Sequence, residues 1–187
     1  MLWRKEIFSH LLVAFVYFFL VSVLRWKLDW GVLMLWLGVL LGTFFLDIDH
    51  LIYWLVTHPE AEDSREVMEV WRTRGTRGIR RIREILENYH QSHNRLVFHS
   101  ALGQVVLLIL AVFVLTSGGS IFGSAFIMAI NLHLLKDEWT DFGQNKDRLA
   151  DWLFWQIREP KLKEYLKEYL VVASLLFLGL TGLLVRG

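Results

Sequence analysis

Five long apolar segments dominate the sequence and limit what it can fold into. Each is close to the roughly 20 residues that an α-helix needs to cross about 30 Å of hydrocarbon. The segments cover residues 7–24, 31–50, 100–117, 121–137 and 167–185. Hydrophobic residues make up 55% of the chain, which is too much for a soluble domain with a polar surface. The sequence therefore predicts an all-α, polytopic membrane helix bundle of about five spans, forming a single membrane-embedded domain over residues 1–187.

The polar segments between the spans predict the orientation of the chain. Residues 57–98 contain eight arginines, six of them in the stretch WRTRGTRGIRRIR. Because basic residues collect in cytoplasmic loops, this segment is expected in the cytoplasm. Counting spans then places the N-terminus and residues 138–166 on the same, cytoplasmic side of the membrane. Each of these two cytoplasmic insertions contains a predicted amphipathic helix, one near residues 79–89 after a break at Gly75 and Gly78, the other near 147–158.

The arginine-rich stretch suggests a partner for this cytoplasmic surface. Anionic membrane lipid is the favoured interpretation, since each basic residue near such a surface contributes roughly 1 kcal/mol of attraction. A protein partner is an alternative. A nucleic acid is disfavoured, because Glu84 and Glu87 partly neutralise the stretch and the whole chain has a net charge of only +1.

Ionisable residues interrupt the apolar segments at particular places. The stretch FFLDIDHLIYW contains Asp47, Asp49 and His50. An unpaired charge at the centre of a membrane helix costs about 2.5–3.5 kcal/mol, so such residues normally serve a function. Four groups of histidines and aspartates, in or beside the first four spans, fall at the predicted cytoplasmic ends: His10; Asp47, Asp49 and His50; His99; and His133 with Asp137. Their common level predicts that they converge on a divalent cation, and the absence of cysteine limits its ligands to imidazoles and carboxylates.

Residue spacing refines this prediction. His133 and Asp137 are four residues apart, so they share one face of a helix and can grip one ion. Gly38 and Gly42 form a small-residue seam that allows close helix packing, and continuing that face along the helix brings Asp49 nearly onto it. Asp49 is therefore the preferred ligand of the two aspartates. Asp47 requires the helix to end or distort near it, or accepts the N–H of a ligand imidazole instead.

Four motifs resemble a known family. The sequence contains S-H at His10, then F-L-D-I-D-H, H-N-R-L-V-F-H-S and N-L-H-L-L-K-D. In this order they resemble the G-H, L-P-D-I-D-H, H-R-G-x-T-H-S and S-H-x-x-x-D motifs of the membrane-bound, metal-dependent hydrolase family (YdjM-like, inner-membrane hydrolases). Leu46 stands where the family has Pro, and the third motif has one residue too many. Either Asn94 takes the place of the first His, or His93 reaches the site across an insertion.

The resemblance implies a multi-span protein of a prokaryotic inner (plasma) membrane, with a metal site and an activity. The similarity of the family's helical core to zinc-dependent phospholipase C and P1-type nucleases implies phosphoester hydrolysis, with a phospholipid or lipid-linked phosphate as substrate. One or two ions are expected, Zn²⁺ foremost, with Mn²⁺ or Fe²⁺ as alternatives. The expected metal ligands are His10, Asp47, Asp49, His50, His93, His99, His133 and Asp137. Asp49 or Asp47 would position or deprotonate water, and Arg95 would neutralise a substrate phosphate.

Two further interpretations come from other classes of protein. In the first, the metal only staples the helices of a non-catalytic scaffold, and the arginine-rich segment binds a partner or anionic lipid. A closed four-ligand site favours this scaffold, and an open coordination position favours the enzyme. The second is an ion transporter, which the absence of ionisable residues near the predicted midplane disfavours. Of the remaining residues, His58 and His90 are expected on the surface, and Asp141 is a less favoured ligand one turn beyond Asp137.

Overall fold

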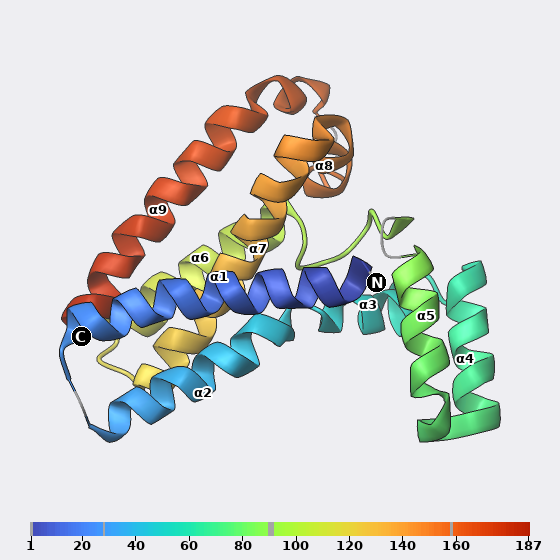
Figure 1. Ribbon diagram of the computed structural model, residues 1–187. Helices are drawn as coiled ribbons and strands as arrows, with labels where there is room; N and C mark the ends of the chain where they lie inside the picture. Colours follow the sequence, from blue (N-terminus) through green and yellow to red (C-terminus); the bar gives the residue numbers. More distant parts are fainter. Residues whose placement is uncertain (1, 28, 90–91, 158) are drawn as a thin grey trace.

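The computed structural model describes residues 2–27, 29–89, 92–157 and 159–187, and within these ranges every regular element is a helix. The all-α prediction is confirmed for this part of the chain. Long helices form the body of the molecule, and a shorter helical hairpin lies beside the N-terminal end of α1 (Figure 1). The C-terminal end of α9 lies at the opposite end of α1, so the two chain termini are far apart.

Three helical segments are long and apolar enough to cross a membrane. They are Lys5–Arg25, which lies in α1 (Leu2–Arg25); Trp30–Thr57, which begins with α2 (Trp30–Phe45); and Lys161–Arg186, which ends with α9 (Leu166–Arg186). On their outer faces these helices expose large apolar side chains such as Phe15, Leu40 and Leu176. Such continuous apolar surfaces are suited to lipid. By the length and composition of these helices, the structure is compatible with a membrane protein.

The two other predicted spans also form helices, with different properties. α6 (Ala101–Thr116) is apolar but only 16 residues long. α7 (Ile121–Gln144) continues past the predicted end at residue 137 and carries Asp137, Glu138 and Asp141 in its second half. Five helices thus cover the five predicted segments, while the topology of five membrane crossings stays a prediction.

α7 lies at the centre of the fold, and α2 packs closely along it. A Cβ atom at Gly38 would lie 2.4 Å from the backbone oxygen of Phe122, and one at Gly42 would lie 2.4 Å from that of Phe126. Real Cβ atoms do not come this close, so only glycine permits this approach of the two backbones. The predicted small-residue seam is therefore present. α7 also contacts α1, α6, α8 and α9, and its buried apolar side chains belong to the main core.

The second span is interrupted after α2. The N–H groups of Asp47, Asp49 and His50 bond to backbone oxygens three residues earlier, in place of the four of an α-helix. The chain then forms α3 (Ile48–Ile52) and a π-helical turn (Tyr53–Thr57). The fully buried Leu46 anchors the interruption in the core, so the break forms without a proline. This tighter turn changes the directions in which the following side chains leave the helix.

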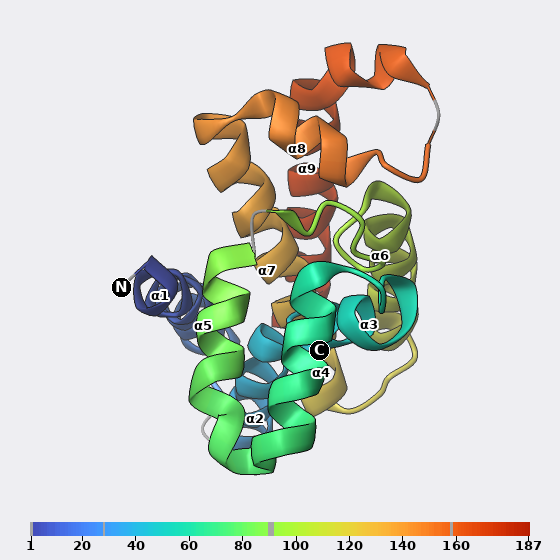
Figure 2. The same ribbon diagram turned by 90° about the vertical axis from the view of Figure 1, so that its right-hand side faces the viewer.

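The arginine-rich segment folds as a separate helical hairpin. α4 (Glu62–Arg74) and α5 (Ile79–Tyr89) are joined by a 3₁₀ turn at Gly75–Gly78, where Gly75 has a φ of +52° that favours glycine. The predicted break and amphipathic helix are both present here. Val67, Val70 and Ile85 of the hairpin form a small second core with Trp54 of the preceding π-helical turn. Figure 2 shows the two antiparallel helices of the hairpin in front of the body.

The segment after α7 turns back over the bundle. The Asn145 side chain accepts the N–H of Arg148 at 3.0 Å and caps α8 (Lys146–Leu153), which ends earlier than the predicted helix. A 3₁₀ turn at Pro160–Tyr165 then leads into α9. α8 thereby lies close to α7 and, through Trp152, whose ring is 6.3 Å from that of His99, to the loop that precedes α6.

Candidate metal centre

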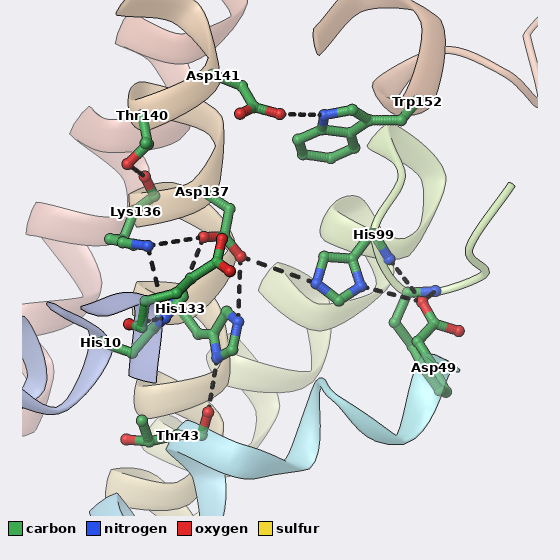
Figure 3. A network of polar contacts seen from close by, with 12 residues as sticks. His10, Thr43, Asp49, His99, His133, Lys136, Asp137, Thr140, Asp141 and Trp152 are labelled. Carbon is green, nitrogen blue, oxygen red and sulfur yellow. Dashed lines mark hydrogen bonds and ion pairs between the residues drawn. The ribbon is translucent and has the colours of Figure 1, made fainter. Parts of the chain in front are cut away.

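Three side chains from α1 and α7 converge near the N-terminal end of α1. His133 and Asp137 lie one turn apart on α7, and Nε2 of His133 is 3.1 Å from Oδ2 of Asp137. His10 approaches from α1, with its Nε2 2.8 Å from Oδ1 of Asp137 (Figure 3). Two ligands of a tetrahedral zinc ion, each about 2.0–2.2 Å from the metal, lie roughly 3.3 Å apart. The cluster of His10, His133 and Asp137 therefore has the dimensions of a metal site.

The second nitrogen of each imidazole determines how these rings are protonated. Nδ1 of His133 lies 2.6 Å from the backbone oxygen of Thr43, and Nδ1 of His10 lies 2.9 Å from that of Glu6. A carbonyl oxygen only accepts, so each Nδ1 donates its hydrogen and Nε2 is left to bind a cation. The contact between Lys136 and His10 Nδ1 is longer, at 3.5 Å.

This arrangement of the rings requires a positive charge between the two Nε2 atoms and the carboxylate of Asp137. Two imidazole lone pairs facing a carboxylate repel it unless a cation lies between them. A second proton on each ring or a single divalent ion supplies that charge. The ammonium of Lys136, 3.2 Å from Oδ1 of Asp137, lies to one side of the carboxylate. One divalent ion would bind both rings and the carboxylate at once. Two imidazole nitrogens and a carboxylate oxygen are a suitable set of ligands for such an ion.

His99 brings a third imidazole to the cluster. Its Nε2 lies 3.9 Å from Oδ2 of Asp137, and its Nδ1 lies 3.2 Å from Oδ2 of Asp49. The Asp49 carboxylate also accepts the backbone N–H groups of Val97, Phe98 and His99, at 3.0, 2.6 and 3.0 Å. These four contacts explain how Asp49 is tolerated with no solvent exposure. A carboxylate on the far nitrogen of a ligand imidazole orients the ring and raises its basicity.

Asp49→Asn tests this orienting role. The asparagine has a similar size, but its amide keeps one acceptor oxygen and turns an N–H₂ group towards the backbone N–H donors. We expect the zinc affinity of the purified protein to fall about 10–100-fold, as for other carboxylates that orient a ligand histidine. Competition with a chromophoric chelator measures the affinity. Asp151→Asn, at an exposed carboxylate paired with Lys163, is the matched control. Equal zinc affinity in both variants would contradict the role.

The other aspartate of the motif lies in a different environment. Asp47 is exposed and lines a small cavity of about 30 Å³ together with His10, His99, His133 and Asp137. This volume holds an ion and about one water molecule. The structure therefore places Asp47 at the open side of the cluster and Asp49 behind His99. Sequence spacing had predicted Asp49 as the better ligand, and Asp47 either as a ligand at a helix end or as the acceptor behind an imidazole. In the structure Asp49 lies behind the imidazole of His99, and Asp47 lines the cavity beside the cluster.

His50 and His93 form a second buried pair beside the cluster. Their Nδ1 atoms are 2.8 Å apart, and Nε2 of His93 is 2.7 Å from Oδ2 of Asp63. The rings of His50 and His99 lie 6.2 Å apart, which links the pair to the first cluster. His93 thus reaches the site, while Asn94 is exposed at its edge. Of the two alternatives for the third motif, the structure places His93 in the buried position.

Asp63 is a site residue that the sequence did not indicate. It lies in the first turn of α4, is almost fully buried, and also accepts the Nε1–H of Trp54 at 2.6 Å. In the sequence it stands in the polar run PEAEDSRE, where a carboxylate is typical of an exposed helix start. The only local signal is Trp54, an indole that needs an acceptor when buried.

Three predicted residues lie away from the cluster or outside the described part. Arg95 is exposed and lines neither of the two cavities beside the cluster. His58 is half-buried and stacks on Tyr53. His90 lies outside the described residues. Asp141 points towards Trp152, whose Nε1–H it accepts at 2.8 Å (Figure 3).

Comparisons with known proteins do not indicate a function for this chain. No protein-family model matches the chain, and neither a curated protein nor a solved structure does. A function is therefore inferred from the chemistry of the cluster and from its position on the helices.

Proposed function

We propose that this chain is an integral-membrane, metal-dependent hydrolase that cleaves a phosphoester in a lipid or lipid-linked substrate. One observation supports it most. The Nε2 atoms of His10, His99 and His133 all face Asp137, while a carbonyl or carboxylate oxygen contacts each Nδ1. The three imidazole rings are thus held with their Nε2 atoms in position to bind an ion, as ligand histidines are in catalytic metal sites. The YdjM-like resemblance of the motifs agrees with this proposal.

Zinc is the ion that best suits these ligands. Imidazole and carboxylate donors without thiolate are compatible with Zn²⁺, and also with Mn²⁺ or Fe²⁺. The cluster of His10, His133 and Asp137 would hold the first ion, with His99 as a further ligand. A second ion would bind between the imidazoles of His50 and His93, where Asp63 orients the ring of His93.

The residues around the cluster have distinct parts in this proposal. A divalent ion at such a site lowers the pKa of bound water towards about 7 and polarises a phosphoryl oxygen. Asp47, exposed beside the cluster, would orient the attacking water and accept its proton. Asp49 would hold His99 in place from behind. The exposed position of Asp47 also leaves this side of the cavity open to substrate.

The position of the site along the helices favours a substrate at the membrane surface. His10 lies in the first half of α1, His99 two residues before the start of α6, and Asp47 two residues after the end of α2, so all three are towards the polar ends of apolar helices. The arginine-rich α4–α5 hairpin lies next to this end of the molecule. By the distribution of basic residues, this end and the N-terminus would face the cytoplasm. A phosphate in a lipid headgroup lies at the corresponding depth.

Metal removal tests the proposed function. We expect protein purified in detergent to contain at least one equivalent of zinc by elemental analysis. It should release phosphate or headgroup from at least one member of a phospholipid and lipid-phosphate panel. A chelator should abolish this activity and added Zn²⁺ should restore it.

Two other outcomes would change the assignment. If the purified protein binds no divalent ion, the proposal of a metal-dependent hydrolase is wrong. A stoichiometric ion with no turnover on any substrate of the panel would support the scaffold instead, in which the ion staples α1 to α7 and the arginine-rich hairpin binds a partner. In that case, chelation should lower the temperature of unfolding without changing any activity.

A further inference from the structure

A second cavity extends from the cluster towards α8. It has a volume of about 50 Å³, and His99 and Asp137 form one side of it. Arg148 and Trp152 of α8, together with Asp141 of α7, line the same cavity. The cavity therefore connects the proposed metal centre to a cationic side chain that the sequence had not indicated as part of a site.

The guanidinium of Arg148 is only partly satisfied within the described residues. Its Nη1 lies 3.6 Å from Oδ1 of Asp141, which is too long for a good hydrogen bond. Its Nε atom is buried and has no hydrogen-bond partner in the described part of the chain. Asp141 itself accepts the Nε1–H of Trp152 at 2.8 Å, so its carboxylate is held in place. Arg148 is thus positioned beside Asp141 while retaining donors for another acceptor.

We propose that Arg148 binds the anionic phosphate group of the substrate and holds it against the ion. The inference rests on the proposed function and deepens it. A guanidinium donates two parallel hydrogen bonds to two oxygens of a phosphate, which an ammonium does not. With the ion on one side and Arg148 on the other, the phosphate would have both of its charge-bearing faces neutralised. The residue supplies the phosphate contact that Arg95 was predicted to make.

The other arginines are less suited to this role. Arg95 is exposed and does not line the cavity. Arg81 is exposed on the hairpin and paired with Glu66 at 2.5 Å and with Glu84 at 3.4 Å. Arg148 combines a position beside the cluster with a buried donor atom, which is why the phosphate is assigned to it.

Phosphate binding by zinc-loaded protein tests the assignment without depending on turnover. The probes are inorganic phosphate and a short-chain phosphatidic acid, each titrated into protein in detergent micelles and followed by calorimetry. Arg148→Gln is expected to weaken the binding of both probes by about tenfold or more, because it removes charge-assisted hydrogen bonds. Arg148→Lys, which keeps the charge and loses the fork, should recover part of the affinity. Arg95→Gln is the matched control and should bind as the unaltered protein does.

The outcomes separate this inference from the proposed function. Zinc content should be the same in all variants, because Arg148 is not a ligand. Unaltered phosphate affinity in zinc-loaded Arg148→Gln would overturn the assignment and leave the hydrolase proposal standing. If the unaltered zinc-loaded protein binds neither probe, the assignment of Arg148 is likewise overturned and the hydrolase proposal stands. Absence of zinc from the unaltered protein overturns both proposals. Tighter binding of phosphatidic acid than of inorganic phosphate would identify a lipid headgroup as the source of the phosphate, and the reverse order a soluble one.

Discussion

Purified His133→Ala protein is expected to lose stoichiometric zinc and, with it, phosphoester hydrolysis. The substitution removes the Nε2 atom that lies 3.1 Å from Asp137, and with it one of the three donors that converge there. Loss of a direct ligand should lower the affinity by more than the 10–100-fold typical of residues that only orient a ligand. Elemental analysis after gel filtration, together with a chelator competition, measures the loss.

His58→Ala is the control for this experiment. His58 is also an imidazole, but it stacks on Tyr53 with ring centres 4.5 Å apart and its Nδ1 contacts Thr57. We expect its removal to leave the zinc bound by His10, His133 and Asp137 in place. If His133→Ala retains the zinc of the unaltered protein, the centre is not where the geometry indicates.

Gly42→Leu on α2 is expected to lower the stability of the protein strongly. Its Cβ would lie 2.4 Å from the backbone oxygen of Phe126 and 2.9 Å from Cβ of Ala129, so α2 and α7 must separate. Overpacking of this kind costs about 1–3 kcal/mol or more, since backbone cannot move aside as a flexible side chain does. Thermal unfolding in detergent, followed by circular dichroism, should show a lower midpoint.

The same change should weaken zinc binding, because the seam and the cluster share residues. Thr43 follows Gly42, and its backbone oxygen accepts the Nδ1–H of His133 at 2.6 Å. Moving α2 away from α7 therefore frees the ring of His133 to rotate. Gly179→Leu on α9 is the matched control, since a Cβ there meets nothing within 4 Å. Equal midpoints and equal zinc affinities for the two leucine variants would show that the seam is not tightly packed.

Local patterns were sufficient for much of the helical fold. Apolar length located the five long helices, and the glycines at residues 75 and 78 marked the turn before α5. The four-residue spacing of His133 and Asp137 placed both on one face of α7, where the structure has them. The extent of α7 was less predictable, because its charged second half is stabilised by tertiary contacts, such as the buried hydrogen bond from Gln104 to Glu138.

The positions of Asp47 and Asp49 relative to the cluster depend on the interruption after α2, which residue spacing does not reveal. Projecting Asp49 onto the glycine seam assumed an uninterrupted helix through residue 50. The bonds to the third preceding residue at Asp47 and Asp49 rotate the chain, so the projection no longer holds. The donors that satisfy Asp49 are backbone N–H groups of Val97, Phe98 and His99, and backbone donors carry no signature in the sequence.

Asp63 and Arg148 were missed for a related reason. Each stands in a polar run, where charged residues are ordinarily solvated, and the position of each depends on contacts that the run itself does not indicate. Asp63 is buried because His93 and Trp54 both contact its carboxylate. Arg148 lines the cavity because the cap at Asn145 starts a new helix there. Such contacts are set by the tertiary fold.

The distribution of the cluster along the chain has a consequence for biosynthesis. His10 is among the first residues to be made, whereas His133 and Asp137 are added more than a hundred residues later. α1 is therefore complete before α2, the hairpin and α6 have been synthesised. The proposed ligand set is complete only once α7 packs beside α1, so binding of the proposed ion would be a late event that joins the first helix to the central one.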